Sequence, residues 1–177
     1  MIILMGVAGA GKSMQGKILA DEHGYAWIST GEILRVLVTG KRRHEMLQGK
    51  LLSDEEMINL MDKVLDLIDT KQEFVLDGFP RTVPQADWLL DQAHKGRFAL
   101  NAVIHLAASE DAVRSRLLSR ARPDDTENAI AKRFSEYNTV TLPILNYLER
   151  EGAKICKIDA SQEVRAVHDA ILKCVDQ

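Results

Sequence analysis

The sequence contains few of the residues that mark secreted, membrane-spanning or nucleic-acid-binding proteins. Cysteine occurs only twice among the 177 residues, as Cys156 and Cys174, and this spacing matches no metal-binding motif. Because each cysteine lies in an apolar stretch, we expect two separate buried thiols in a reducing compartment, and therefore a cytoplasmic protein. No apolar run approaches the length of a membrane span and no leader-like segment precedes the first one, so we expect no membrane partner.

An excess of charge is missing as well. The chain has 23 Lys and Arg against 26 Asp and Glu, a net charge of −3. Nucleic-acid-binding domains usually carry a basic excess, so we expect no nucleic-acid partner. The length suits one domain with one substantial core.

Short, continuously apolar segments alternate with longer stretches of helical pattern. Such segments are typical of strands buried on both faces of a parallel sheet. We expect strands over 2–5, 26–28, 74–76, 102–106 and 153–158, and helices over 12–23, 30–48 with a break at Gly40, 53–70, 83–95, 109–120, 125–151 and 161–175. Ser53 and Ser161 are helix start signals. The pattern predicts an α/β, doubly wound, five-stranded parallel sheet with helices on both faces and ligands at the carboxyl ends of its strands.

The segment 31–70, between the second and third expected strands, is wholly helical. A simple crossover needs one helix there, so the surplus is either a substrate-binding arm or ordinary helical decoration.

A phosphate-binding motif directly follows the first expected strand. Residues Gly6 to Ser13 read Gly-Val-Ala-Gly-Ala-Gly-Lys-Ser, which fits G-x-x-x-x-G-K-[ST]. Glycine suits this loop because a Cβ would obstruct a polyphosphate and because the backbone takes angles that other residues resist. We expect Lys12 to reach the β- and γ-phosphates of a nucleotide and the Ser13 hydroxyl to approach a Mg²⁺ ion.

Polar residues follow the third expected strand. Asp77 stands where a ligand to a Mg²⁺-bound water belongs, at the carboxyl end of a buried strand beside the phosphate loop. Gly78 and Pro80 predict a turn, after which the planar guanidinium of Arg81 suits phosphate oxygens. The alternative is a plain turn with a solvated arginine.

Four arginines form a further cluster in the sequence: Arg116, Arg120, Arg122 and Arg133. Arg116 and Arg120 share one helix face. Converging arginines suit the charge that develops during phosphoryl transfer. A solvated charged helix face is the alternative interpretation.

In these motifs the chain resembles the adenylate kinase family of nucleoside monophosphate kinases, in its short-lid form, over nearly its whole length. The motifs that carry the resemblance occur in order: Gly6 to Ser13 with Gln15, Ile28-Ser29-Thr30-Gly31-Glu32 with Arg35, Gly49-Lys50-Leu51-Leu52, Asp77 to Thr82 with Pro84-Gln85, and Arg120-x-Arg122-x-Asp124-Asp125 leading to Arg133.

The resemblance implies a single P-loop kinase domain over 1–177. Its core would comprise 1–29, 71–119 and 126–177, its monophosphate-binding arm 30–60, and its very short lid 120–125. It implies reversible in-line transfer of the γ-phosphoryl group of Mg-ATP to AMP, giving two ADP. An AMP phosphate oxygen is already an anionic nucleophile, so the reaction needs no general base.

The resemblance also assigns roles to residues of this chain. The catalytic set would be Lys12, Arg81, Arg120, Arg122 and Arg133. ATP would contact Gly6, Gly9, Ala10, Gly11, Lys12, Ser13, Met14, Arg116 and Arg120, with Arg116 stacked on the adenine. AMP would contact Thr30, Gly31, Arg35, Gly78, Arg81, Gln85, Arg122 and Arg133. Ser13 and Asp77 would hold Mg²⁺ through water, and Asp124 with Asp125 would form an acidic pair in the lid.

The chain departs from the family pattern in a few places. Ser13 and Met14 stand where the family usually has Gly and Thr, and the arm is short around Gly40 to Gly49. The lid has no zinc-type cysteines, so the resemblance predicts no structural zinc. It predicts a monomer that prefers AMP, on the basis of Thr30, Thr82 and Gln85. A kinase of UMP, CMP or dAMP and a non-catalytic nucleotide-sensing module are the alternatives.

Overall fold

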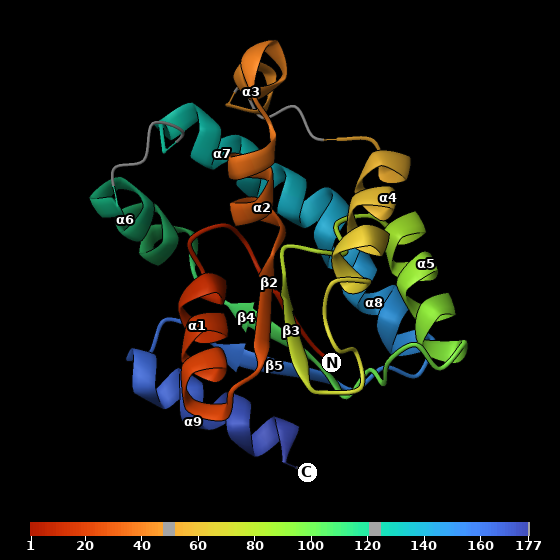
Figure 1. Ribbon diagram of the computed structural model, residues 1–177. Coiled ribbons are helices and arrows are strands. Elements are labelled where there is room, and N and C mark those ends of the chain that lie inside the picture. The colour runs from red at the N-terminus through yellow and green to blue at the C-terminus, as the bar shows by residue number, and fades with distance from the viewer. Residues whose placement is uncertain (48–51, 121–124, 177) are drawn as a thin grey trace.

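The computed structural model describes residues 1–47, 52–120 and 125–176 (Figure 1). Within these ranges the sheet has five parallel strands in the order β2-β3-β1-β4-β5. The strands are β1 Ile2–Met5, β2 Ala26–Ser29, β3 Phe74–Asp77, β4 Ala102–Ala107 and β5 Ile155–Asp159. The expected α/β fold with a five-stranded parallel sheet is confirmed.

Helices cover both faces of this sheet. They are α1 Lys12–His23, α2 Thr30–Leu37, α3 Gly40–Leu47, α4 Asp54–Leu65, α5 Val83–His94, α6 Glu110–Arg120, α7 Glu127–Glu136, α8 Leu142–Arg150 and α9 Val164–Val175. Side chains alternate across β1: Ile2 and Leu4 join the core cluster under α1, α6 and α9, whereas Ile3 and Met5 join the cluster under α4, α5 and α8. Figure 1 shows these two helical layers on opposite sides of the strands.

The expected helix over 125–151 is interrupted. A π-helical turn, Tyr137–Thr141, lies between α7 and α8. Pro143 near the start of α8 has no N–H to donate to the carbonyl of Thr139, so a regular helix cannot continue through this point.

The Tyr137 hydroxyl hydrogen-bonds to Nε2 of His105 on β4. His105 is therefore a buried histidine with a hydrogen-bond partner inside the fold.

The expectation of two separate thiols is wrong. Cys156 on β5 and Cys174 on α9 form a disulfide, with Cα atoms 6.4 Å apart. The two elements are consecutive along the chain and α9 folds back onto the sheet, which brings the two cysteines together. Their spacing in the sequence could not show that these two positions face one another.

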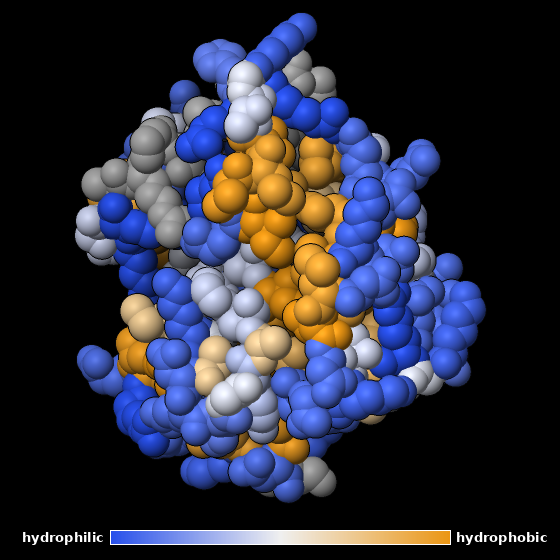
Figure 2. All heavy atoms as spheres, in the orientation of Figure 1, coloured by the Kyte–Doolittle hydropathy of each residue, from blue (hydrophilic) through white to orange (hydrophobic). Residues whose placement is uncertain are grey.

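The helices between β2 and β3 differ in burial. On α4, Met57, Met61 and Leu65 are buried in the core, and α4 packs beside α5. On α2, Val36 is 78% exposed and Leu37 is 60% exposed. Figure 2 shows the resulting hydrophobic patch over α2 and between α2 and α4. In the part of the chain that the structure describes, no helix combines the length and apolar character needed to cross a membrane.

Candidate active site

The glycine-rich loop connects β1 to α1 as the sequence predicts. α1 begins at Lys12, directly after Gly11, whose φ of 100° lies in the left-handed region that glycine tolerates. A Cβ on Gly6 would lie 2.5 Å from the carbonyl oxygen of Leu106 on β4, so the loop runs too close to the neighbouring strand for a larger residue. The loop and the N-terminus of α1 therefore lie at the carboxyl end of β1, where phosphate binds in such folds.

Lys12 is folded over this loop. Its Nζ donates hydrogen bonds to the carbonyl oxygens of Gly6 at 2.8 Å and Val7 at 3.0 Å. Burial lowers the pKa of Lys12 to about 8; the charge of Asp77 opposes this, while Arg81 and Arg120 add to it. The pKa of this one ammonium group thus depends on three charged side chains from other parts of the chain, and each of the three is a predicted site residue.

We expect Lys12 to titrate near pH 8 in the nucleotide-free protein. The pKa is depressed, so the ammonium is intact below pH 8 and is lost as the pH rises past it. NMR of ¹³C-labelled lysine should show one such resonance, and Lys12→Arg should remove it. Because Asp77 raises this pKa, Asp77→Asn should lower it further; an upward shift in that variant would contradict the arrangement. The kcat/KM for ATP should fall above the same pH.

The predicted Mg²⁺ residues lie together. Asp77 ends β3, pairs with Leu4 in the register of the sheet and is 3% exposed. Its Oδ2 accepts a hydrogen bond of 2.6 Å from Ser13 Oγ. A hydroxyl and a carboxylate at the mouth of a phosphate loop are oxygen ligands of the kind that Mg²⁺ uses directly or through water. The donor set therefore fits this ion.

The turn after β3 brings a second group of predicted residues together. Gly78 has a φ of 85°, and a Cβ there would lie 2.6 Å from Thr30 Oγ1 and 3.3 Å from a terminal nitrogen of Arg81. Thr30 donates to the Asp77 carbonyl at 3.3 Å, and Arg81 Nε donates to the Gly78 carbonyl at 2.8 Å. The side chain of Thr30 and the guanidinium of Arg81 therefore share the space left by the missing side chain of Gly78.

Arg81 lies among charges while remaining exposed to solvent. Burial by the surrounding protein lowers its pKa; Asp77 and Glu136 oppose this, and Arg133 and Arg35 add to it. A side chain inside an open crevice is expected to be both exposed to solvent and surrounded by charged groups, as Arg81 is. Arg35, on α2, forms an ion pair with Glu32 at 2.6 Å, and it lies close enough to Arg81 for its charge to act on that guanidinium.

Gln85 is held by a residue that sequence reasoning missed. Gln85 is 3% exposed; its Oε1 accepts from the backbone N–H of Arg81 at 2.8 Å, and its Nε2 donates to Asp54 at 2.7 Å. The same Asp54 oxygen accepts from Thr82 Oγ1 at 2.7 Å. Asp54 thus joins the start of α4 to the turn after β3. The sequence marked it only as part of the helix start at Ser53, which does form a capping box with Glu56.

Two of the four predicted arginines, Arg120 and Arg133, meet at one buried carboxylate. Asp125 has a fully buried side chain and accepts two hydrogen bonds from Arg120, at 2.9 and 2.8 Å, and one from Arg133 at 2.9 Å. These contacts join the end of α6 to α7. Arg122 and Asp124 lie outside the described residues, so their predicted roles stay predictions.

A pocket lies at the carboxyl ends of β4 and β5. It has a volume of about 490 Å³ and is lined by Ala107, Ala108, Ser109, Lys157, Asp159 and Ser161. Arg116, half-buried on α6, is close enough to act on Asp159, whose pKa is lowered by hydrogen bonds from Ser161 and, to a smaller extent, by the charge of Arg116.

Met14, in the first turn of α1, is 55% exposed, so its side chain contributes little to the core.

The sheet order, the phosphate loop, the acidic residue on the adjacent strand and the surrounding arginines define a P-loop nucleotide-binding protein built for phosphoryl chemistry. The family model described as adenylate kinase matches residues 4–153. Curated relatives named adenylate kinase include one from Corynebacterium urealyticum, 36% identical with 99% of each chain covered, and one from Nitrobacter hamburgensis, 35% identical with 99% of this chain and 92% of the relative covered.

A further relative, named adenylate kinase 1, from Nostoc sp., is 37% identical, with 92% of each chain covered. The chain belongs to the adenylate kinase family. It is therefore a phosphotransferase enzyme, as the sequence motifs predicted.

Proposed function

We propose that the chain transfers the γ-phosphoryl group of Mg-ATP reversibly to AMP, giving two ADP, through the residues gathered around the phosphate loop. One observation carries this proposal: Asp77, Arg81 and Arg120 all lie close enough to Lys12 for their charges to act on its ammonium group. The four side chains come from α1, β3, the turn that follows it and α6, and their charges are the ones that phosphoryl transfer requires.

In this proposal the residues act by alignment and charge. Lys12 and the loop amides hold the donor phosphates, Arg81 holds the acceptor phosphate, and Arg120 with Arg133 faces the group in transfer. Mg²⁺, held through Ser13 and Asp77, would supply further neutralisation of the donor phosphates when bound. The acceptor phosphate oxygen is anionic, so no residue has to remove a proton.

The two bases would lie on opposite sides of the loop. The pocket of about 490 Å³ at the ends of β4 and β5 is large enough for a nucleobase and is close to Arg116, which supports it as the donor base site. Thr30 and Gln85 are buried beside Arg81, which supports the turn after β3 as the acceptor site. The Gln85 amide nitrogen donates one hydrogen to Asp54, and this leaves its second hydrogen for the base of the acceptor.

The remaining expectations concern the oligomeric state, the partners and the location of the protein rather than its site. A monomer with no nucleic-acid or membrane partner stays a prediction. A cytoplasmic location stays a prediction too, and the disulfide between Cys156 and Cys174 counts against it, because cytosolic proteins rarely carry structural disulfides.

The test is a coupled assay of ADP formation from Mg-ATP with AMP, dAMP, UMP, CMP or GMP as acceptor. We expect AMP to give the highest kcat/KM. A preference for UMP or CMP would contradict the base assignment, and no turnover with any acceptor, together with tight ATP binding, would favour a nucleotide sensor. Omitting Mg²⁺ should abolish transfer, and activity that persists without it would contradict the role given to Ser13 and Asp77.

A further inference from the structure

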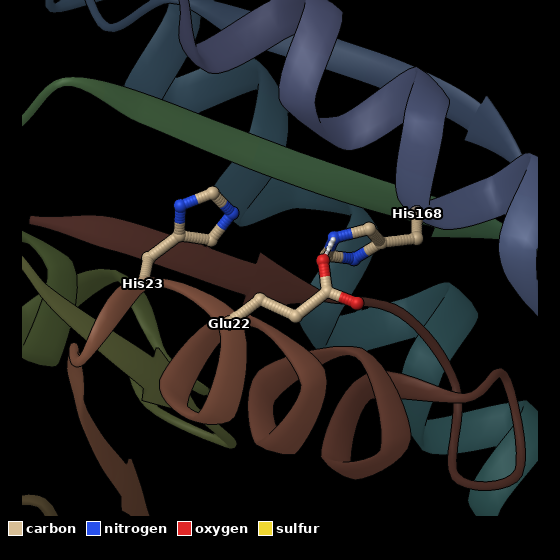
Figure 3. Close-up of side chains that lie close together, drawn as sticks. All are labelled: Glu22, His23 and His168. Atoms are coloured by element: carbon tan, nitrogen blue, oxygen red, sulfur yellow. Dashed lines mark ion pairs between the residues drawn. The ribbon is translucent and has the colours of Figure 1, made fainter.

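We propose that Glu22, His23 and His168 form a binding site for a divalent transition-metal ion of the zinc class, where the end of α1 meets α9. Each residue offers one ligand atom, and these atoms all lie within 4.8 Å of one another. Figure 3 shows the two imidazole rings and the carboxylate approaching one another from the two helices. Two imidazoles and a carboxylate are a donor set that holds zinc and related ions.

The tautomer of the neutral His168 ring is set by its neighbour Gln15. The Gln15 amide nitrogen donates to the carbonyl of Val164 at 2.9 Å, so its oxygen faces Nδ1 of His168 at 3.2 Å. An amide oxygen can only accept, and Nδ1 must therefore carry the proton. In the neutral ring this leaves Nε2 with a lone pair. A metal-binding histidine is usually oriented in this way, by a hydrogen bond from its other ring nitrogen.

The lone-pair nitrogen of His168 faces the carboxylate of Glu22. His168 is 0% exposed, and its Nε2 faces Glu22 Oε2 at 3.2 Å, a contact that is an ion pair only if the ring is protonated on both nitrogens; in the neutral ring, Nε2 has no hydrogen bond among the described residues. A buried polar atom without a hydrogen bond is costly, and a lone pair facing a carboxylate is repelled. Two ligand atoms at about 2.0–2.1 Å from one tetrahedral zinc ion lie about 3.3 Å apart. A cation shared by Nε2 and Oε2 would therefore satisfy both atoms at close to their present separation.

The other two ligands are held in place but remain accessible. Glu22 Oε1 accepts a hydrogen bond from Arg165 at 2.6 Å, which holds the carboxylate in place and leaves Oε2 for the metal. The His23 ring stacks on Tyr25 with ring centroids 5.3 Å apart. Glu22 and His23 are exposed, so an ion can enter from solvent. The sequence did not reveal this site because its ligands combine adjacent residues on α1 with one distant residue on α9.

The test is calorimetric titration of the chelator-treated, full-length protein with ZnCl₂, without reductant so that the disulfide stays intact. We expect one ion per chain. His23→Asn and Glu22→Gln should each weaken zinc affinity more than about tenfold, because even outer-shell partners of a metal contribute 10–100-fold. His94→Asn is the matched control, an exposed histidine on α5, and should bind zinc as the unaltered protein does. Co²⁺ should give the visible absorption of a four-coordinate site, which His23→Asn should lose.

Three results would overturn the proposal. The first is no zinc uptake by the unaltered protein, which would leave an ion pair between a protonated His168 and Glu22 as the explanation of their contact. The second is unchanged zinc affinity in His23→Asn, an exposed position whose replacement should not disturb the core. The third is equal weakening in His94→Asn, which would indicate scattered surface binding.

Discussion

Replacement of Arg81 by Ala should lower kcat/KM by about three orders of magnitude or more, while the free energy of unfolding stays nearly unchanged. Arg81 would hold the acceptor phosphate against the donor, where it also neutralises charge on the reacting phosphates, and arginines in that role contribute roughly 10³–10⁵ to the rate. Arg81 is exposed within the crevice, and its Nε bonds to the nearby Gly78 carbonyl, so the side chain does not tie distant elements together. Its backbone N–H would keep the hydrogen bond to Gln85.

Steady-state kinetics and urea unfolding of the same preparation separate the two effects. Arg150→Ala is a suitable control, because Arg150 is exposed at the end of α8 and its Nε also donates to a nearby carbonyl, that of Asn146. We expect the control to match the unaltered enzyme in both measurements. Arg81→Lys should recover only part of the activity, because an ammonium cannot bind two phosphate oxygens as a planar fork does. An Arg81→Ala enzyme within threefold of normal would contradict the proposed acceptor site.

Local signals in the sequence were enough to place the phosphate loop and the sheet. The loop motif depends on consecutive residues, so α1 begins at Lys12 as predicted. Ser13 and Asp77, which the sequence assigned to the same Mg²⁺ ion, lie in contact, because the carboxyl ends of neighbouring parallel strands meet at one edge of a sheet. The first inference needs only consecutive residues, and the second needs only that the two strands run parallel.

Features that depend on side chains meeting across the fold were harder to predict. The start of the last helix was wrong for a different, local reason: the N–H and hydroxyl of Ser161 bond to Asp159, two residues earlier, and α9 begins at Val164. Asp54 is a polar residue within a helix start in the sequence, and its partners Thr82 and Gln85 become visible only in the fold. The disulfide was missed for the same reason. Such pairings are set by the distance between elements, and sequence spacing does not encode that distance.

Replacement of Asp125 by Ala should damage both stability and catalysis. The side chain of Asp125 is fully buried and accepts three hydrogen bonds from Arg120 and Arg133. Removing one partner of a buried ion pair costs about 3–5 kcal/mol. The two arginine side chains are 34% and 25% exposed, so water can partly replace the lost carboxylate, and we expect about 2 kcal/mol of lost unfolding free energy. Without this anchor the guanidinium groups lose their fixed positions, and misplacement by about 1 Å can cost roughly 100-fold in rate.

Thermal or urea unfolding and kcat at saturating substrates measure the two effects. Asp91→Ala is the matched control, because Asp91 forms an exposed ion pair with Lys95 on α5, and exposed pairs of this kind contribute about 0.3–0.5 kcal/mol. Asp125→Asn keeps an oxygen acceptor for the arginines but removes the charge, so it should fall between Asp125→Ala and the unaltered enzyme in both measurements. If Asp125→Ala instead raised kcat, the carboxylate would be competing with the substrate phosphates for the arginines. Asp125 would then restrain these arginines rather than position them for transfer.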